Sequence, residues 1–159
     1  GLYRRSLYTF WKRMSPPPNM ETLNAPSREF SCLRRERTNT PLQALITLND
    51  PQFVEAARNL AQRVLRIEAG AKSKPSNHAA RIDLATQLVL CRRPTPAEAD
   101  SIESALEDVL RYYRSHPDDA SNLIRVGETR PDASLDAAEL AAWTTLCNGL
   151  LNLDEALNK

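Results

Sequence analysis

The spacing of apolar residues changes along the chain, and from residue 41 onward apolar residues recur at intervals of three and four. This interval places apolar side chains on one side of an α-helix. Thr40-Pro41 and Asp50-Pro51 each put a capping residue before a proline that suits the first helical position. We therefore predict one helix over about 41–48 and a second from 51 to a C-terminal end at Gly70.

Two capping boxes mark the starts of further helices. Thr95-Pro96-Ala97-Glu98 opens a helix that ends before Pro117, and Asp136-Ala137-Ala138-Glu139 opens the last one, which continues through 151–157 after a kink. Helices are also predicted over about 78–91 and 119–126. The residues expected to face the core share the helical spacing; they are Phe53, Ala57, Leu60, Val64, Ile67, Ile82, Ala85, Leu88, Val89, Ile102, Leu106, Val109, Tyr113, Trp143, Leu146 and Leu150.

No segment of useful length alternates apolar and polar residues as a β-strand does. The four glycines are too few for a fold of tight hairpins or for a glycine-rich phosphate loop. A chain of 159 residues corresponds to one domain and is long enough to bury a hydrophobic core. We expect an all-α fold, a single domain over 1–159 that is an irregular array of about five to seven helices.

The first 40 residues have a different pattern. An apolar residue at every third or fourth position predicts an amphipathic helix over about 2–14, which the prolines at 16–18 end. From 15 to 40 no periodicity is sustained, and a stretch of this length without regular structure is uncommon in a compact domain. We expect a long ordered loop that packs over the helices through its apolar residues, which are Met20, Leu23, Phe30, Cys32 and Leu33.

The charged residues are distributed unevenly. The whole chain has 21 basic and 20 acidic residues, a net charge of +1. Residues 1–40 hold eight basic and three acidic residues, a net charge of +5, and the remaining 13 basic and 17 acidic residues give −4. This asymmetry is typical of two regions that attract each other or of a basic docking surface. Because the total is near neutral, no nucleic-acid partner is expected. The longest uncharged stretch, 140–153, is too short to span a bilayer, so no membrane span is predicted either.

The cysteines and histidines predict no metal site, no cofactor and no catalytic group in this chain. Cys32, Cys91 and Cys147 are far from any CxxC, CxxCH or zinc spacing, so we interpret them as small buried hydrophobic residues without a disulfide. His78 and His116 lie outside any catalytic motif, at the expected exposed ends of helices.

One dense polar segment is the candidate site. It runs from Arg28 to Gln43, and the residues expected to contact an anion or a partner are Arg28, Arg34, Arg35, Arg37, Asn39 and Gln43. Guanidinium groups just upstream of a helix start suit a carboxylate, phosphate or sulfate ligand. The alternative is that Glu29, Glu36, Asp50 and later acids pair with the arginines and hold the loop in place. We favour this structural role, because arginines in ordered loops commonly form internal ion pairs.

Long motifs resemble a known family. The run Leu2-Tyr3-Arg4-Arg5-Ser6-Leu7-Tyr8-Thr9-Phe10-Trp11-Lys12-Arg13, the prolines at 16–18, and Arg34-Arg35-Glu36-Arg37-Thr38-Asn39-Thr40-Pro41-Leu42-Gln43 resemble the planctomycete-specific domain family of unknown function. So do Leu48-Asn49-Asp50-Pro51-Gln52-Phe53, Ala141-Ala142-Trp143-Thr144 and Leu150-Leu151-Asn152-Leu153-Asp154-Glu155. The chain departs from the family pattern at Leu23-Asn24, where Phe-Asp is expected, and at Ala156, where an aromatic residue is expected.

The resemblance implies a C-terminal part of such a domain, at the end of a large exported protein of the periplasm or cell envelope. Such proteins often also carry a cytochrome-c-like segment, and because this chain has no CxxCH, any haem belongs to another segment. Our leading hypothesis is a non-catalytic interaction module that contacts other domains of the parent chain or protein partners, with the arginine loop as its docking or anion-contacting surface. The alternative is part of an enzyme acting on extracellular, sulfated polysaccharide, with the arginine loop binding substrate anions.

Overall fold

The computed structural model describes residues 6–12, 15–27, 29–34, 38–69 and 78–158. Within these ranges the chain forms one 3₁₀ turn, eight α-helices and no β-strand, so the expected all-α class is confirmed with one helix more than the expected range. The elements are η1 (Ser6–Tyr8), α1 (Pro18–Thr22), α2 (Pro41–Asn49), α3 (Pro51–Ala69), α4 (His78–Leu90), α5 (Pro96–Ser115), α6 (Pro117–Ile124), α7 (Ala137–Leu151) and α8 (Asp154–Leu157).

Capping sets most of the helix starts at the predicted positions. Thr40 and Thr95 each accept a hydrogen bond from the N3 backbone, and the N3 side chain returns one, so α2 and α5 begin with complete capping boxes. Asp136 accepts from the Glu139 N–H at 2.9 Å and so caps α7. The carboxylate of Glu139 forms an ion pair with Arg81 at 2.6 Å. In the second predicted capping box, Asp136 therefore caps the helix, while Glu139 links α7 to α4.

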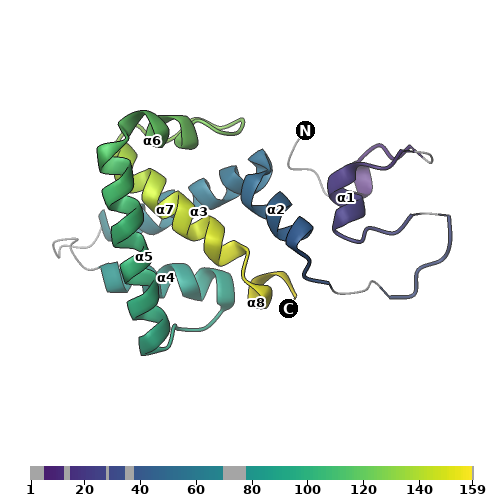
Figure 1. The fold of residues 1–159 in the computed structure, drawn as a ribbon, viewed down its shortest axis with the longest axis horizontal. Helices are drawn as coiled ribbons and strands as arrows, with labels where there is room; N and C mark the ends of the chain where they lie inside the picture. The colour runs from purple at the N-terminus through teal and green to yellow at the C-terminus, as the bar shows by residue number, and fades with distance from the viewer. Residues whose placement is uncertain (1–5, 13–14, 28, 35–37, 70–77, 159) are drawn as a thin grey trace.

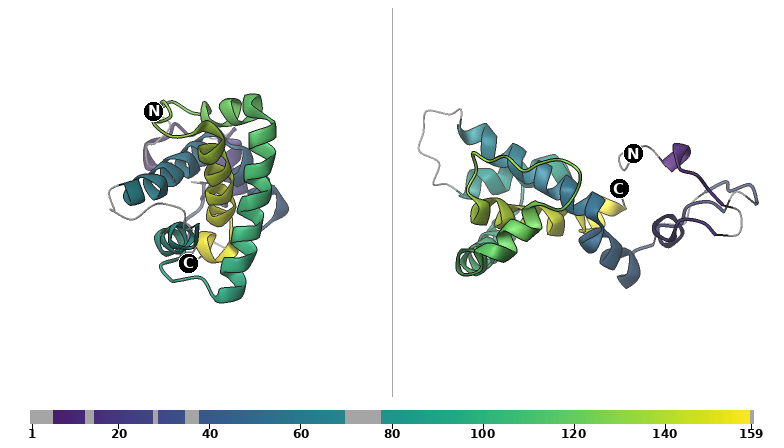
Figure 2. Two further views of the ribbon diagram at one scale, coloured as in Figure 1. Left: turned by 90° about the vertical axis from the view of Figure 1, so that its left-hand side faces the viewer. Right: turned by 90° about the horizontal axis from the view of Figure 1, so that it is seen from above.

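Helix α7 lies in the middle of the molecule. It packs against α3, α5, α6 and α4, and Figure 1 shows it running diagonally between α3 and α5 with α6 at one end. Figure 2 shows the same arrangement from two further sides, with α5 along one flank of the bundle. The break expected after residue 151 is present, because α7 ends at Leu151 and the short α8 follows at Asp154.

The core is built on α7. Leu140, Ala141, Ala142, Trp143 and Cys147 are completely buried. A helix buried on nearly every side is expected to be apolar all round, as the sequence of α7 is. The predicted inward residues of the other helices are buried or half-buried, except that the Ile67 side chain and Gly70 lie outside the described residues.

The N-terminal part of the chain differs from its prediction. We define the N-terminal arm as the described residues from 6 to 40, and the body as those from 41 to 158. Of the helix predicted over 2–14, the described part forms only the turn η1, and Tyr3 and Met14 lie outside the described residues. The loop predicted over 15–40 contains α1 and is otherwise irregular. Figures 1 and 2 show the arm at one end of the molecule, beyond α2.

The arm packs on the helices only in part. Met20 of α1 is half-buried and α1 contacts α2, but Phe30 is 80% exposed, Leu33 is fully exposed, and Cys32 is exposed as well. The sequence pattern does not determine which of these apolar residues meets another surface. Cys91 is also exposed, so only Cys147 is the small buried hydrophobic residue that was predicted. No helix in the described ranges is long and apolar enough to cross a membrane.

Candidate functional site

The predicted arginine segment is only partly described. Arg28, Arg35 and Arg37 lie outside the described residues, as does Glu36. Arg34 is exposed. Asp50, one of the acids expected to pair with these arginines, instead accepts hydrogen bonds from the Asn19 side chain and from the Gln52 N–H.

Asn39 and Gln43, the two amide residues of the predicted site, hold the arm to the body. The Asn39 amide donates to the Asp154 carboxylate at 3.0 Å. The Gln43 side chain is buried; its oxygen accepts from the Thr40 N–H at 3.0 Å, and its nitrogen donates to the Thr22 carbonyl at 2.8 Å. The two side chains thus link the arm to the body, Asn39 through its amide nitrogen and Gln43 through both of its polar atoms.

Asn24, where the family resemblance leads one to expect Asp, belongs to the same set of contacts. Its amide nitrogen donates to Thr38 Oγ1 at 2.5 Å, and its backbone has a φ of 55°. Asn is among the few residues that adopt this left-handed conformation readily. The amide thus links two parts of the arm that a carboxylate could join only as an acceptor.

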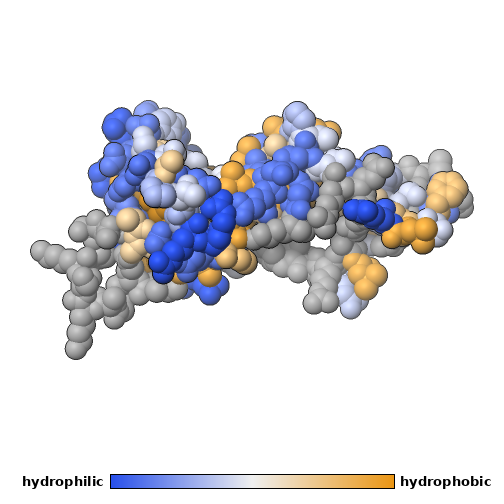
Figure 3. Space-filling model, turned by 90° about the horizontal axis from the view of Figure 1, so that it is seen from below, coloured by the Kyte–Doolittle hydropathy of each residue, from blue (hydrophilic) through white to orange (hydrophobic). Residues whose placement is uncertain are grey.

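Large apolar side chains gather on the outside of the arm. Leu7, Tyr8, Phe10, Phe30 and Leu33 are each at least two-thirds exposed. We call these five residues the arm surface. Figure 3 shows orange, hydrophobic residues at the surface of this end of the molecule. On the adjoining helix α2, Leu42, Leu45 and Leu48 are also exposed.

A fully buried ion pair, which the sequence pattern did not indicate, lies on α3. Glu55 and Arg58 are both 0% exposed and lie 3.2 Å apart, one turn from each other. Arg58 donates to the carbonyls of Ile124, Val126 and Thr129 at 2.5–2.8 Å. Glu55 accepts from the backbone N–H groups of Glu128 and Thr129. The pair therefore fixes the loop after α6 against α3.

Gly127 permits this close approach. Its φ is +104°, and a Cβ there would collide with the Glu55 carboxylate. Glycine alone adopts this conformation without strain and leaves room for the carboxylate. The glycine, the acid and the arginine thus form one structural unit.

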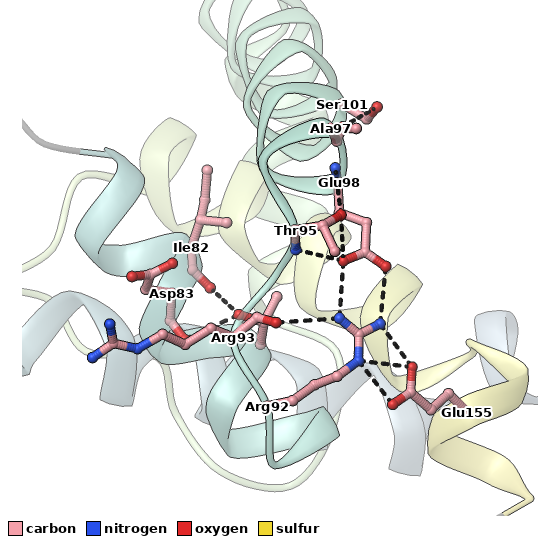
Figure 4. Close-up of polar contacts among 10 residues, drawn as sticks. Ile82, Asp83, Arg92, Arg93, Thr95, Ala97, Glu98, Ser101 and Glu155 are labelled. Atoms are coloured by element: carbon pink, nitrogen blue, oxygen red, sulfur yellow. Dashed lines mark hydrogen bonds and ion pairs between the residues drawn. The ribbon is translucent and has the colours of Figure 1, made fainter.

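A second arginine, Arg92, joins three separate parts of the body. Its guanidinium donates two bonds of 2.9 Å to Glu98, at the start of α5, and bonds of 2.8–3.2 Å to Glu155 of α8. Figure 4 shows the guanidinium between the two carboxylates. These bonds, with those from Thr95, lower the pKa of Glu98 from 4.5 to about 2, and the two acids raise the pKa of Arg92.

The two histidines lie at helix ends, as predicted, but only His116 is exposed as expected. His116 is exposed and stacks on Tyr112, with 4.4 Å between ring centroids. Ser115 Oγ lies 2.9 Å from His116 Nδ1 but also donates to the Tyr112 carbonyl at 2.8 Å, so this hydroxyl closes the last turn of α5. His78 opens α4 and is half-buried beside Trp143. Among the described residues, no group of three or more metal-ligating side chains is present.

Comparison with known proteins gives one family. A family model described as PSD1, protein of unknown function (DUF1553), matches residues 1–106. Neither the curated proteins nor the solved structures give a match. The matched region contains the arm and the helices α1 to α4, whereas the residues 141–155 that also suggested a family resemblance lie beyond it. Since two-thirds of the chain is matched, the chain belongs to this family.

Proposed function

We propose that this member of the DUF1553 family is a helical interaction module, and that the arm surface is where it binds another protein surface. One observation carries the proposal: the five apolar side chains of the arm surface are 68–102% exposed, next to a well-packed body. Contiguous exposed apolar surface in a soluble protein is typical of an interaction site.

The charge of the arm indicates the chemistry of the partner. Residues 1–40 carry a net charge of +5, and the described basic side chains of Lys12 and Arg34 are exposed among the apolar ones. Interfaces combine a buried apolar centre with a polar rim of complementary charge. The partner proposed here is therefore a protein surface with an apolar centre and an acidic rim.

We propose that this partner surface belongs to another domain of the same parent protein. The family resemblance implies that this parent protein is large and exported. The contacts that join the arm to the body support this placement. They are hydrogen bonds of polar side chains such as Asn39 and Gln43, which fix the arm in place and leave its apolar residues free to be covered. An arm held in advance loses little conformational freedom on binding.

The experiment uses the purified chain and separately purified neighbouring domains of the parent protein, titrated by calorimetry. Leu33→Glu should weaken binding at least 10-fold, since a buried apolar anchor at the centre of an interface contributes about 1–2 kcal/mol or more. Arg34→Glu should also weaken binding and reduce its dependence on salt. The matched control is Leu157→Glu, on a leucine of α8 that is also exposed, and it should bind as the unchanged chain does.

Three outcomes would overturn the proposal. Light scattering that shows a dimer disrupted by Leu33→Glu would assign the arm surface to a second copy of the chain. Binding to a sulfated polysaccharide that Arg34→Glu abolishes and Leu33→Glu leaves intact would favour the alternative of a substrate-binding part of an enzyme. Equal binding of the neighbouring domains by Leu33→Glu and Leu157→Glu would show that the arm surface is not the contact.

A further inference from the structure

Three arginines meet on a side of the body that the arm does not form. Asn59, Gln62, Arg63 and Arg66 follow one another at intervals of three and one along α3, which places them on the same face of the helix. Arg130 approaches this face from the loop between α6 and α7. Together these five residues line an open cleft of about 400 Å³, and we call it the α3 cleft.

The walls of the α3 cleft are fixed by hydrogen bonds. Gln62 is 5% exposed; its oxygen accepts from the Asp132 N–H at 2.8 Å and its nitrogen donates to Asn59 Oδ1 at 3.1 Å. Thr129, which precedes Arg130, is bonded through its backbone to the buried Glu55 and Arg58. The backbone on both sides of Arg130 is thus attached to α3, so the cleft exists before any ligand enters it.

One acid close to the α3 cleft is already occupied. Asp132 accepts from Arg66 at 2.7–2.8 Å and from the N–H and hydroxyl of Ser134 at 2.7–3.0 Å. These bonds, those from Ser134 first, lower the pKa of Asp132 from 3.8 to about 2. The carboxylate is therefore ionised at neutral pH and bound to one of the three arginines.

The other two arginines remain uncompensated. Arg63 and Arg130 are exposed, and neither makes an ion pair or a side-chain hydrogen bond with the rest of the described chain. Glu128 and Asp136, the other two acids of this loop, are not among the residues that line the α3 cleft. Like charges that face one cleft repel each other, and an anion between them removes that repulsion.

We propose that the α3 cleft binds a tetrahedral oxyanion, a phosphate or sulfate group. Guanidinium groups bind such oxygens in pairs of parallel hydrogen bonds, and groups that approach from a helix and from a loop match an anion with oxygens on several sides. A volume of about 400 Å³ lies within the range of small-molecule sites. It accommodates the anion together with part of the molecule that carries it. Asn59 and Gln62, which also line the cleft, would lie next to that part of the molecule.

The test measures binding of inorganic phosphate and inorganic sulfate to the purified chain, by calorimetry and by the rise in melting temperature. Sodium chloride of equal ionic strength is the reference. We expect saturable binding at one site. Arg63→Gln and Arg130→Gln should each weaken it at least 5-fold, and the double variant should abolish it. These side chains are exposed, so circular dichroism of the variants should match that of the unchanged chain.

The matched control is Arg114→Gln, on an exposed arginine of α5 that also has no ion pair within the described residues. It removes the same charge from the chain and should leave the affinity unchanged. An equal loss in Arg114→Gln and Arg63→Gln would show that only the overall charge matters and would overturn the proposal. So would the absence of saturation, or acetate binding as tightly as sulfate.

Two further ligands identify the source of the oxyanion. A sugar phosphate and a sugar sulfate are compared with the inorganic ions and with the unmodified sugar. If the esters bind at least 10-fold more tightly than the inorganic ions, the α3 cleft recognises the group on a larger molecule. If all bind alike, the free ion is the ligand. Both results require that Arg63→Gln and Arg130→Gln weaken binding, which separates them from a nonspecific charge effect.

Discussion

The loop after α6 and the N-terminal arm are both irregular segments rich in charge, but they are held in opposite ways. Glu55 and Arg58 lie inside the protein at 0% exposure and bind the backbone of residues 124–129. The arm is joined to the body through hydrogen bonds of uncharged amides, the exposed Asn39 and the buried Gln43, and its large apolar residues are exposed. The first segment is held by buried groups of this chain, whereas the large apolar side chains of the second are exposed.

This difference shows why residue type alone does not assign a role. Arginines were expected to hold the arm in place, but Arg28, Arg35 and Arg37 lie outside the described residues. Among the described arginines, Arg58 of α3 holds the loop after α6 through three backbone carbonyls. Because an unpaired charge inside a protein is very unfavourable, a buried ion pair must stay intact for the protein to remain stable. The predictions below test how far the two segments differ, from the largest expected effect to the smallest.

The largest effect is expected for Arg58→Ala. The substitution leaves the Glu55 carboxylate buried without its partner and three backbone carbonyls without their donor. The free energy of unfolding should fall by about 3–5 kcal/mol, measured by urea denaturation. Arg63→Ala, five residues further along α3 and exposed, is the control and should change it by no more than about 0.5 kcal/mol. Equal effects would contradict the structural role of the pair.

Gly127→Ala should cause the next largest loss of stability. Alanine at a φ of +104° is strained, and its Cβ would meet the Glu55 carboxylate, so a loss of about 1–3 kcal/mol in unfolding free energy is expected. Gly149→Ala is the control, because it lies within α7 with nothing within 4 Å of the added carbon. That change should stabilise the protein by about 0.5–1 kcal/mol. Calorimetric melting temperatures that moved in the same direction for both variants would refute the argument.

Lowering the pH should have a smaller effect on the stability of the protein. The pKa values of Glu98 and Asp132 lie at about 2 in the folded protein, below 4.5 and 3.8. A lowered carboxyl pKa contributes stability that is complete above the ordinary value and is lost as the pH falls toward the folded one. Melting temperatures should therefore be insensitive to these groups between pH 7 and 5 and should decline from about pH 4.5 to 2.

Single variants separate the two carboxyl groups. In Glu98→Gln and Asp132→Asn the decline below pH 4.5 should be shallower, because each lacks one of the groups that take up a proton on unfolding. Glu103→Gln on α5, whose carboxylate makes no bond within the described residues, should keep the full decline. A slope unchanged by either of the first two variants would count against these hydrogen bonds in solution.

The smallest effect is expected for Leu33→Ser. Because this side chain is fully exposed, the unfolding free energy of the isolated chain should change by less than about 0.5 kcal/mol. A loss above about 1 kcal/mol, measured by urea denaturation, would show that Leu33 packs against the chain itself, and the two segments would then no longer differ in kind.

The sequence predicted most of the helices of the body, but few of the contacts between those helices and the loops that join them. Proline at the first helical position and Thr40 or Thr95 before it act within one turn, so α2 and α5 could be located from a few neighbouring residues. The spacing of apolar residues likewise gave the inward faces of α4, α5 and α7. Both signals are local, and local signals determine where helices begin and which side they bury.

The arm and the α3 cleft depend on residues far apart in sequence, and therefore they were not predicted. Whether Phe30 is buried depends on which surface reaches it, which its neighbours in the sequence do not reveal. Arg66 and Arg130 are 64 positions apart, and the loop that brings them to one cleft is placed by the buried Glu55 and Arg58. Gly127, directly after the predicted end of a helix, was the local sign of a special backbone conformation at that loop.

The central position of α7 has a consequence for the order in which the protein is made. A ribosome adds residues one at a time from the N-terminus, at about 5–20 per second, so α3, α5 and α6 emerge before the helix on which they pack. The apolar faces of these three helices stay exposed to water until Trp143 and its neighbours have been synthesised. The matched family region, residues 1–106, ends within α5 and lacks this hub. The apolar faces of α3, α5 and α6 are therefore covered only after residues 137–151 have been synthesised.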